Sequence, residues 1–365
     1  MKIQLCILLF FLSCISVHSA YSQKNASGNI QSSYDDSLRA ILKTAREDSN
    51  KVKTLNKLSD NLKNEGDYKA SAQYAEESAK LAEKINFQVG QINAIVILGT
   101  LHNRQGEPGK ALERYQSALR IAESIKDTFR ISNLLGGMGN AYKNQGDFPK
   151  GLEYYLRSLK LAEIIKEKAI IERQFGNIGI VYVALHDYQK ALDYYTKALK
   201  MAEESGNRSS VARHLNNIGI VYDEQKEFGK ALDYYSRSIK IKEETGDLTT
   251  IAADYGNLGN VYADMGNREK ALEYFNKALK KAEELGDKKT ICINTGNIGL
   301  EYLKQDKYTE AERYFLTAIK FAEEGRLLSS ASELHFLLSK TYSGEKQWQK
   351  ALSHYKMYIS EKDSL

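Results

Sequence analysis

The sequence predicts an all-α solenoid of antiparallel helix pairs, and three observations lead to this prediction. A unit of 40 residues recurs eight times between Val52 and Leu365 without insertion or deletion, the last copy being truncated. Each unit contains two stretches with the helical spacing of apolar or small residues, separated by a turn. Prolines are almost absent, with two in the whole chain. A fixed period of this length indicates stacked units that cover one another's apolar faces.

The first helix of each unit is indicated by apolar or small residues at positions 4, 7, 8 and 11, counted from Val52 and its equivalents. A glycine inside a helix costs roughly 1 kcal/mol relative to alanine. We therefore expect the glycine at position 8 to allow a close approach between packed helices. It recurs as Gly99, Gly139, Gly179, Gly219, Gly259 and Gly299.

The second helix begins after an acidic or amide residue at position 16, which suits an N-cap. Pro108 and Pro149 follow this cap in the first turn, where proline is tolerated. Small residues at positions 20 and 27 flank an aromatic residue at position 24. Three units end in a glycine that suits a left-handed helix stop, and these are Gly206, Gly246 and Gly286.

The first 22 residues differ from the repeats. A positive Lys2 precedes a mostly apolar stretch and then small residues, as in a secretory signal peptide over residues 1–22. We therefore expect an exported protein, periplasmic or extracellular. Lipid anchoring at Cys14 is an alternative, although the residues before it match the bacterial lipoprotein signal poorly. A flexible segment over residues 23–35 and a leading half-repeat helix over residues 36–51 are expected to follow.

Removal of the leader would leave Cys292 as the single cysteine. No internal disulfide could then form. Because Cys292 lies at the start of an apolar helix, we expect it to be buried in the core.

The pattern resembles the tetratricopeptide repeat family. The family has an aromatic residue, Leu, Gly and Tyr in the first helix and Ala, an aromatic residue and Ala in the second, at the offsets found over residues 52–365. The longer period and the GNLGN-x-Y and AEELGD segments resemble an extended 40-residue-repeat subclass. The chain is also similar to the repeat region of bacterial envelope sensor and regulator proteins. This resemblance implies a right-handed superhelical solenoid.

The resemblance also implies that positions 2, 5, 9, 12 and 13 of the first helices line a concave groove. Here these positions are rich in amides and arginine, which can bond the backbone of an extended peptide or clamp a carboxylate. The alternative is a solvated helix face without a ligand. The candidate groove residues are Asn93, Asn103, Arg104, Asn133, Asn140, Lys143, Asn144, Arg173, Arg213, Asn216, Asp223, Glu224, Asn260 and Asp264.

An asparagine ladder at position 6 borders the same face. Its members adjoin the apolar residue of position 7, so hydrogen bonding between repeats and ligand contact are both open. The ladder consists of Asn177, Asn217, Asn257 and Asn297.

Two further rows lie on the second helices. A lysine recurs at position 19, where solvation is favoured over an anion site. A tyrosine stripe at position 23 is favoured as packing between repeats over a stacking platform, and it consists of Tyr154, Tyr194, Tyr234 and Tyr274.

Catalytic and cofactor motifs are missing from the sequence. Beyond the leader, the histidines show no metal-ligand spacing, and no H-E-x-x-H or phosphate loop occurs. We expect no catalytic residue, no metal and no cofactor. Basic and acidic residues alternate and the net charge is only +5, so a nucleic acid partner is not expected.

The sequence therefore predicts a non-catalytic scaffold that binds a peptide or protein partner in its groove. The alternative is the sensor region of an envelope signal-transduction protein, of the histidine kinase or transcriptional regulator type, whose output domain lies elsewhere. A self-associating solenoid is a third possibility. The last repeat has Ser339 and Tyr358 in place of small residues, with Trp348 and Tyr355 nearby, so it is a candidate for docking a further domain or partner.

Overall fold

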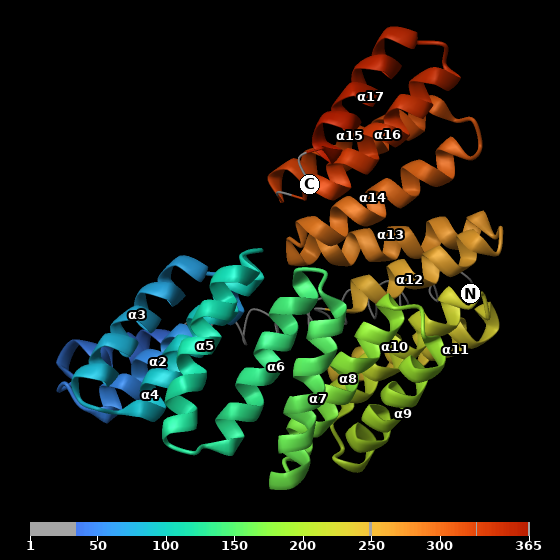
Figure 1. Ribbon diagram of the computed structural model, residues 1–365. Helices are drawn as coiled ribbons and strands as arrows, with labels where there is room; N and C mark the ends of the chain where they lie inside the picture. Colours follow the sequence, from blue (N-terminus) through green and yellow to red (C-terminus); the bar gives the residue numbers. More distant parts are fainter. Residues whose placement is uncertain (1–33, 248–249, 326, 364–365) are drawn as a thin grey trace, which may run out of the picture. The chain divides into compact units, whose positions relative to one another are not determined.

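The computed structural model describes residues 34–247, 250–325 and 327–363 (Figure 1). Helices joined by short turns make up this part of the chain, and no strand occurs in it. The predicted signal peptide and nearly all of the predicted flexible segment lie outside the described residues. The expected all-α class is confirmed.

Each repeat contributes two helices of 14 to 18 residues. The first helices are α2 (Ser49–Glu65), α4 (Gln88–Arg104), α6 (Thr128–Asn144), α8 (Lys168–Ala184), α10 (Arg208–Glu224), α12 (Ile251–Asp264), α14 (Lys288–Leu303) and α16 (Leu328–Gly344). The second helices are α3 (Tyr68–Lys84), α5 (Pro108–Ser124), α7 (Phe148–Ile165), α9 (Tyr188–Glu204), α11 (Phe228–Thr245), α13 (Arg268–Leu285), α15 (Tyr308–Glu324) and α17 (Trp348–Lys362).

The leading half-repeat helix expected over residues 36–51 is divided in the structure. Residues 34–44 form one helix, and Ser49 begins α2. The division arises because the Asp48 carboxylate accepts hydrogen bonds from the backbone N–H groups of Asn50 and Lys51 and so caps a new helix. The first full repeat therefore starts three residues before Val52.

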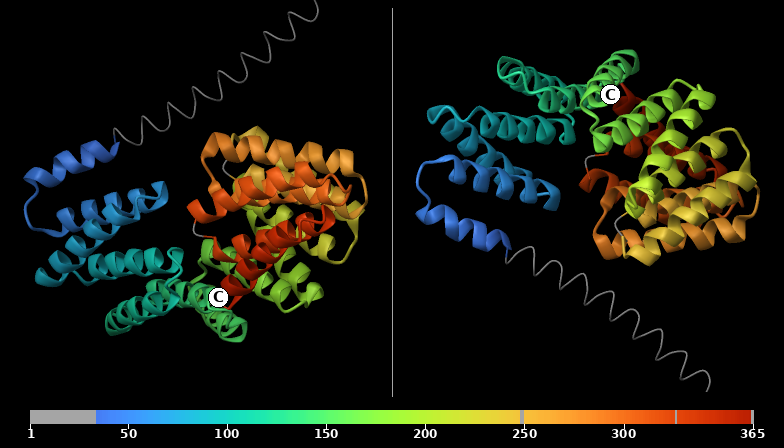
Figure 2. Two further views of the ribbon diagram at one scale, coloured as in Figure 1. Left: turned by 90° about the horizontal axis from the view of Figure 1, so that it is seen from above. Right: turned by 90° about the horizontal axis from the view of Figure 1, so that it is seen from below.

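The described helices fall into two compact units, one ending at Tyr194 and the other beginning at Tyr195 within α9. Each unit is a stack of antiparallel helix pairs, seen from two further directions in Figure 2. In each unit a first helix contacts the first helix of the next repeat. For example, α2 contacts α4, and α14 contacts α16. Among the described second helices other than α9, which crosses the boundary between the units, no two make such a contact. The first helices therefore line the inner side of each curved stack.

The position-8 glycines lie directly under the aromatic ring of the second helix in the same repeat. A Cβ atom on Gly139 would come within 2.6 Å of the Tyr155 ring, and one on Gly259 within 2.5 Å of the Phe275 ring. Both rings are buried. The expected close approach is confirmed, and it explains why a residue that weakens helices recurs here.

The predicted helix ends are also confirmed. The side chains of Asp67, Asp147 and Asn267 each accept a hydrogen bond from a backbone N–H in the first turn of a second helix. Gly246 and Gly286 end α11 and α13 with φ of 69° and 68°, in the left-handed region that favours glycine.

The tyrosine stripe stacks within each repeat as well as packing between repeats. Tyr274 stacks on Tyr262 of its own repeat, with ring centroids 5.4 Å apart, and it also packs against the core cluster that contains Tyr235 and Ile239 of the preceding repeat. The lysine row is part of this stack, because the Lys270 ammonium lies 4.9 Å from the Tyr262 ring centroid. Lys277 covers the outer ring at 4.8 Å. Five position-19 lysines contact aromatic faces in this way, with cation–π contacts that hold the two helices of a repeat together, and these are Lys150, Lys190, Lys230, Lys270 and Lys350.

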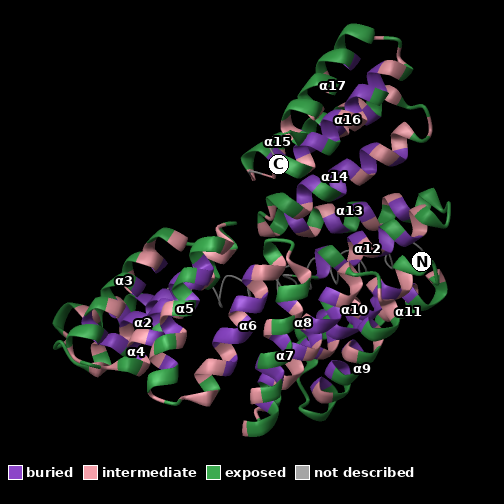
Figure 3. Ribbon diagram, viewed as in Figure 1, coloured by how far each residue is buried: buried purple, intermediate pink, exposed green. Residues whose placement is uncertain are grey.

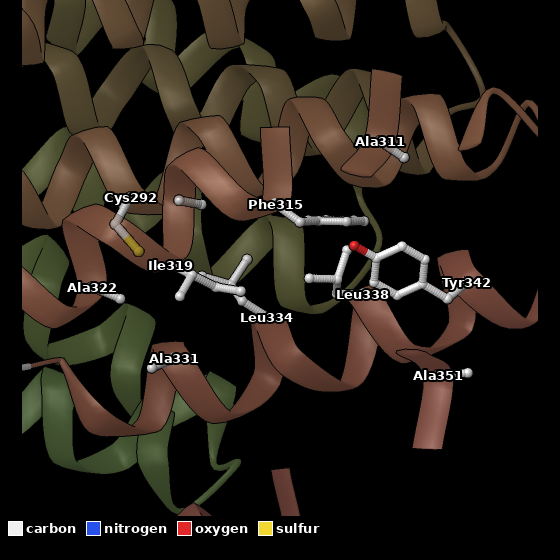
Figure 4. Close-up of a cluster of buried hydrophobic side chains, with 11 residues drawn as sticks. Cys292, Ala311, Phe315, Ile319, Ala322, Ala331, Leu334, Leu338, Tyr342 and Ala351 are labelled. Carbon is white, nitrogen blue, oxygen red and sulfur yellow. The ribbon is translucent and has the colours of Figure 1, made fainter. Parts of the chain in front are cut away.

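The cores run along the helix interfaces (Figure 3). In the last repeats, Phe315 and Ile319 of α15 point towards Leu334 and Leu338 of α16 (Figure 4). Cys292 lies in the same cluster with 1% of its surface exposed, as expected.

One repeat junction contains an ion pair in its core. The Lys242 ammonium lies 2.8 Å from the Asp254 carboxylate, and both side chains are buried. The Ser238 hydroxyl donates a second hydrogen bond to this carboxylate at 2.6 Å. Other repeats have alanine at the position of Lys242, as at Ala282 and Ala322. This pair therefore makes the junction of α11 with α12 unlike the apolar ones.

Candidate binding face

The predicted groove residues lie on the first helices, which line the inner side of each unit. We call this surface the inner face. In the N-terminal unit it contains the candidates from Asn93 to Arg173, and in the C-terminal unit those from Arg213 to Asp264. All of them are exposed or half-buried. The structure therefore leaves each candidate within reach of a ligand.

Several inner-face side chains of the N-terminal unit bond to the neighbouring repeat. The Asn144 amide donates to Asn103 Oδ1 at 3.1 Å, and Arg104 Nη1 donates to the backbone carbonyl of Lys63 at 3.1 Å. Arg173 Nη2 donates to Asn133 Oδ1. These bonds connect consecutive repeats, so they fix the stacking of the first helices as well as shaping the face.

Two further amides of this unit have local roles. The Tyr155 hydroxyl donates to Asn140 Oδ1 at 2.7 Å, which joins the two helices of one repeat. The Asn133 amide donates to the backbone carbonyl of Phe129. Asn93 is exposed. A ligand that bound Asn140 or Asn133 would have to share or replace these bonds.

The inner face of the C-terminal unit is bonded in the same way. The Lys226 ammonium lies 2.8 Å from the Asp264 carboxylate of the next repeat. Arg213 Nη2 donates to the Ser210 hydroxyl at 2.9 Å, and Glu224 is exposed. The asparagine ladder contributes two more bonds between repeats: Asn257 donates to Asn216 Oδ1 at 3.1 Å and Asn297 to Asn260 Oδ1 at 3.0 Å.

For Asn257 and Asn297 the structure therefore favours hydrogen bonding between repeats over ligand contact, the two roles that the sequence left open. The Asn177 amide instead donates to Gln174 Oε1 within its own helix at 3.2 Å, and Asn217 is half-buried. The ladder thus bonds between repeats at two of its four members. Its contact with a ligand stays a prediction.

Lys143 differs from the other residues of the inner face. Its side chain is half-buried, and no hydrogen bond or ion pair of its ammonium occurs among the described residues. Burial lowers the pKa of the Lys143 ammonium because the charged form loses solvation. An anionic group placed beside it would recover that lost solvation, so Lys143 is the strongest candidate for ligand contact in the N-terminal unit.

Asp223 of the C-terminal unit stands at the same repeat position as Lys143 and carries the opposite charge. Its Oδ1 atom is buried without a hydrogen-bond partner among the described atoms. Burial raises the pKa of Asp223 to about 6, with Lys226 opposing the shift and Asp264 adding to it. A cationic or N–H group of a ligand would stabilise the ionised carboxylate.

The two inner faces therefore differ in charge. Among the candidates, the N-terminal face presents Arg104, Lys143 and Arg173 and no acid, whereas the C-terminal face presents Asp223, Glu224 and Asp264 beside Arg213. Sequence reasoning identified these positions but missed Lys226, which lies in the turn after α10 and pairs with Asp264. In the sequence, Lys226 could have been noticed because it stands at a repeat position where other repeats have glycine, as at Gly146.

The described residues contain no group of His, Cys, Asp and Glu side chains placed to hold a metal ion. Within the same residues, no helix has the length and apolar character needed to cross a membrane.

Comparison with known proteins adds a family and a fold. A family model described as tetratricopeptide repeat matches residues 33–124, 130–204, 167–244 and 249–324. A search of curated proteins found no match. Among solved structures, the apo quorum sensor NprR from B. thuringiensis is similar with a TM-score of 0.65 and 14% identity, over 89% of this chain and 91% of that one.

Two more solved structures share the arrangement. The Rap conjugation gene regulator of plasmid pLS20, in complex with the Phr* peptide, has a TM-score of 0.59 and 14% identity, over 92% of this chain and 95% of that one. Aspartyl phosphate phosphatase F from Bacillus subtilis has a TM-score of 0.63 and 17% identity, over 90% and 88%. At these identities the likeness shows a common helical-repeat fold.

Proposed function

The chain belongs to the tetratricopeptide repeat family, and on this premise we propose that it is a non-catalytic scaffold that binds a peptide or protein segment on its inner face. The observation that carries the proposal is the half-buried Lys143 ammonium, which has no partner among the described residues on a face of amides and cations. An anionic ligand group beside this ammonium would offset the solvation that burial removes.

The chemistry of the ligand follows from the residues available. In the N-terminal unit, Arg104, Lys143 and Arg173 favour a segment with a carboxylate, from an acidic side chain or a chain terminus. Exposed amides such as Asn93 and Asn144 can bond the backbone of an extended segment. The pLS20 regulator, solved with a peptide, supports a peptide as ligand, although the similarity by itself shows only the fold.

A peptide-display selection tests this function. The purified chain is immobilised and used to select from a library of random peptides, and the affinities of the recovered peptides are then measured. We expect acidic peptides to be enriched. The triple variant Arg104→Ala, Lys143→Ala, Arg173→Ala should bind them at least about tenfold more weakly, because each charge-assisted hydrogen bond contributes on the order of 1.5–3 kcal/mol.

A control with the same loss of charge lies on the second helices. The triple variant Lys80→Ala, Arg120→Ala, Lys160→Ala also removes three cations, but from exposed sites on α3, α5 and α7 away from the inner face. Its affinity should be unchanged apart from a small long-range effect. Equal weakening in the two triple variants would show that net charge, rather than the inner face, drives binding.

Export is part of the proposal, and the sensor region of an envelope signal-transduction protein is the alternative function. Both depend on the expected signal peptide over residues 1–22. Fractionation of cells that produce the chain would test export, with recovery in the periplasm or the medium as the expected result. A chain found only in the cytoplasm would remove both export and the envelope sensor.

A further inference from the structure

One part of the inner face of the N-terminal unit is apolar. On α8, Ile180, Val183 and Ala184 follow the spacing i, i+3 and i+4, so their side chains are neighbours on one side of the helix. Ile180 is 38% exposed, and Val183 and Ala184 are half-buried. They occupy positions 9, 12 and 13 of their repeat, which are inner-face positions. We call these three residues the apolar patch.

The two preceding first helices carry polar side chains at the same three positions. The change from polar to apolar occurs between two helices that touch, because α6 contacts α8 within the N-terminal unit. The apolar patch therefore continues the polar part of the inner face. The polar equivalents are Thr100, Asn103 and Arg104 on α4, and Asn140, Lys143 and Asn144 on α6.

The apolar patch also explains why α8 offers Lys143 no bond. Where α4 meets α6, Asn144 at position 13 donates to Asn103 at position 12 of the preceding repeat. Where α6 meets α8, the corresponding residues are Ala184 and Lys143. The alanine side chain has no acceptor, and the Lys143 ammonium has no hydrogen bond or ion pair among the described residues. The structure thus places an ammonium that lacks a partner beside an accessible apolar surface.

We propose that the apolar patch binds a bulky apolar side chain of the same peptide segment whose carboxylate meets Lys143. This inference rests on the proposed function and adds a second requirement for its ligand. The carboxylate forms a charge-assisted hydrogen bond with the ammonium, and the apolar side chain removes the surface of Ile180 and Val183 from water. A ligand with only one of these groups leaves the other half of the site unfilled.

The packing of α6 against α8 sets the spacing of these two groups in the ligand. The axes of packed helices lie about 8–10 Å apart. In an extended segment, alternate side chains face the same way, and two residues advance the chain by about 7 Å. The long side chain of Lys143 covers the remaining distance. We therefore expect the bulky apolar residue two positions away from the acidic residue.

The sequences of peptides selected with the purified chain give the first test. The enriched acidic peptides should carry Leu, Ile, Val, Met or Phe two positions from the acidic residue. A synthetic peptide with this pattern is then compared with a second peptide in which Ser replaces the apolar residue. The second peptide should bind about tenfold more weakly in fluorescence anisotropy, because it loses the apolar contact.

Two double variants of the chain locate this contact. The variant Ile180→Asn, Val183→Asn introduces the residue type that other repeats have at these positions, so circular dichroism should be unchanged. It should bind the apolar peptide about tenfold more weakly and should no longer distinguish it from the Ser peptide. The control Leu156→Asn, Ile164→Asn removes two exposed apolar side chains from α7, a second helix. It should bind both peptides as the unchanged chain does.

Acidic peptides selected without an apolar preference would overturn the role of the apolar patch and leave the proposed function standing. Equal affinity of the two double variants for the apolar peptide would do the same. Loss of binding in the triple variant of Arg104, Lys143 and Arg173 is measured separately, so it supports the inner face whichever result the apolar patch gives. If no acidic peptide is selected, the proposed function and this inference both fail.

Discussion

Gly259 and Phe275 are in such close contact that a methyl group on the glycine would lie 2.5 Å from two ring carbons. Gly99 stands in the same relation to Tyr115, and Gly299 to Phe315. This contact sets the distance between the two helices of a repeat, and it recurs within both units.

Gly259→Ala should therefore destabilise the protein although it improves helix propensity. Overpacking costs about 1–3 kcal/mol, and removing a helix glycine returns about 1 kcal/mol. We expect a lower urea midpoint in circular dichroism. Gly229→Ala is the control, because no atom lies within 4 Å of a Cβ at Gly229. It should be neutral or stabilising, and equal loss in both variants would contradict a steric cause.

Asp254→Ala should cost about 3–5 kcal/mol, because it leaves the Lys242 ammonium buried without its partner. The double variant Lys242→Ala, Asp254→Leu should regain most of this loss. It places at both positions the residues of other repeats, such as Ala282 and Leu334. Chemical denaturation followed by circular dichroism measures both effects. A double variant no more stable than the single one would show that the junction needs the ion pair itself.

Asp223 should make the unfolding free energy depend on pH. Its pKa is about 6 in the folded protein against an ordinary value of 3.8, so the fold holds the proton more tightly than the unfolded chain does. The resulting stabilisation is present below pH 3.8 and is lost as the pH rises through 6.

Asp223→Asn, which stays neutral, should lack this loss and should be the more stable protein above pH 6. Urea unfolding at several pH values from about 4 to 7 measures the difference. Asp233→Asn, at an exposed site on α11, is the control and should keep the pH profile of the unchanged chain. Parallel profiles for the unchanged chain and Asp223→Asn would contradict the raised pKa.

Cys292 should react with thiol reagents only when its repeat opens. The side chain is 1% exposed, and burial raises the pKa of its thiol, so little thiolate is present. In a chain with Cys6→Ser and Cys14→Ser, labelling should be slow in native buffer and complete in urea. Rapid native labelling would show that the C-terminal unit opens locally far more often than its core predicts.

The repeat architecture could be predicted because its determinants are local and recur. Asp147 caps α7 through a side chain three residues away from the N–H that it binds, and Gly246 ends α11 through its own backbone angles. The polar track could be located but its bonding could not. That Asn144 bonds Asn103 depends on the distance between two helices 41 residues apart in sequence.

The sequence by itself thus determined the helix pairs, their ends, the buried aromatic layer and the face on which polar residues gather. Each depends on spacing within one repeat, where helix geometry converts sequence separation into position. The tertiary structure alone decided which polar groups bond between repeats, that Lys143 and Asp223 are half-buried, and that the rings of Phe336 and Tyr358 lie 5.1 Å apart. These depend on how neighbouring helices approach one another, and spacing within one repeat does not encode that distance.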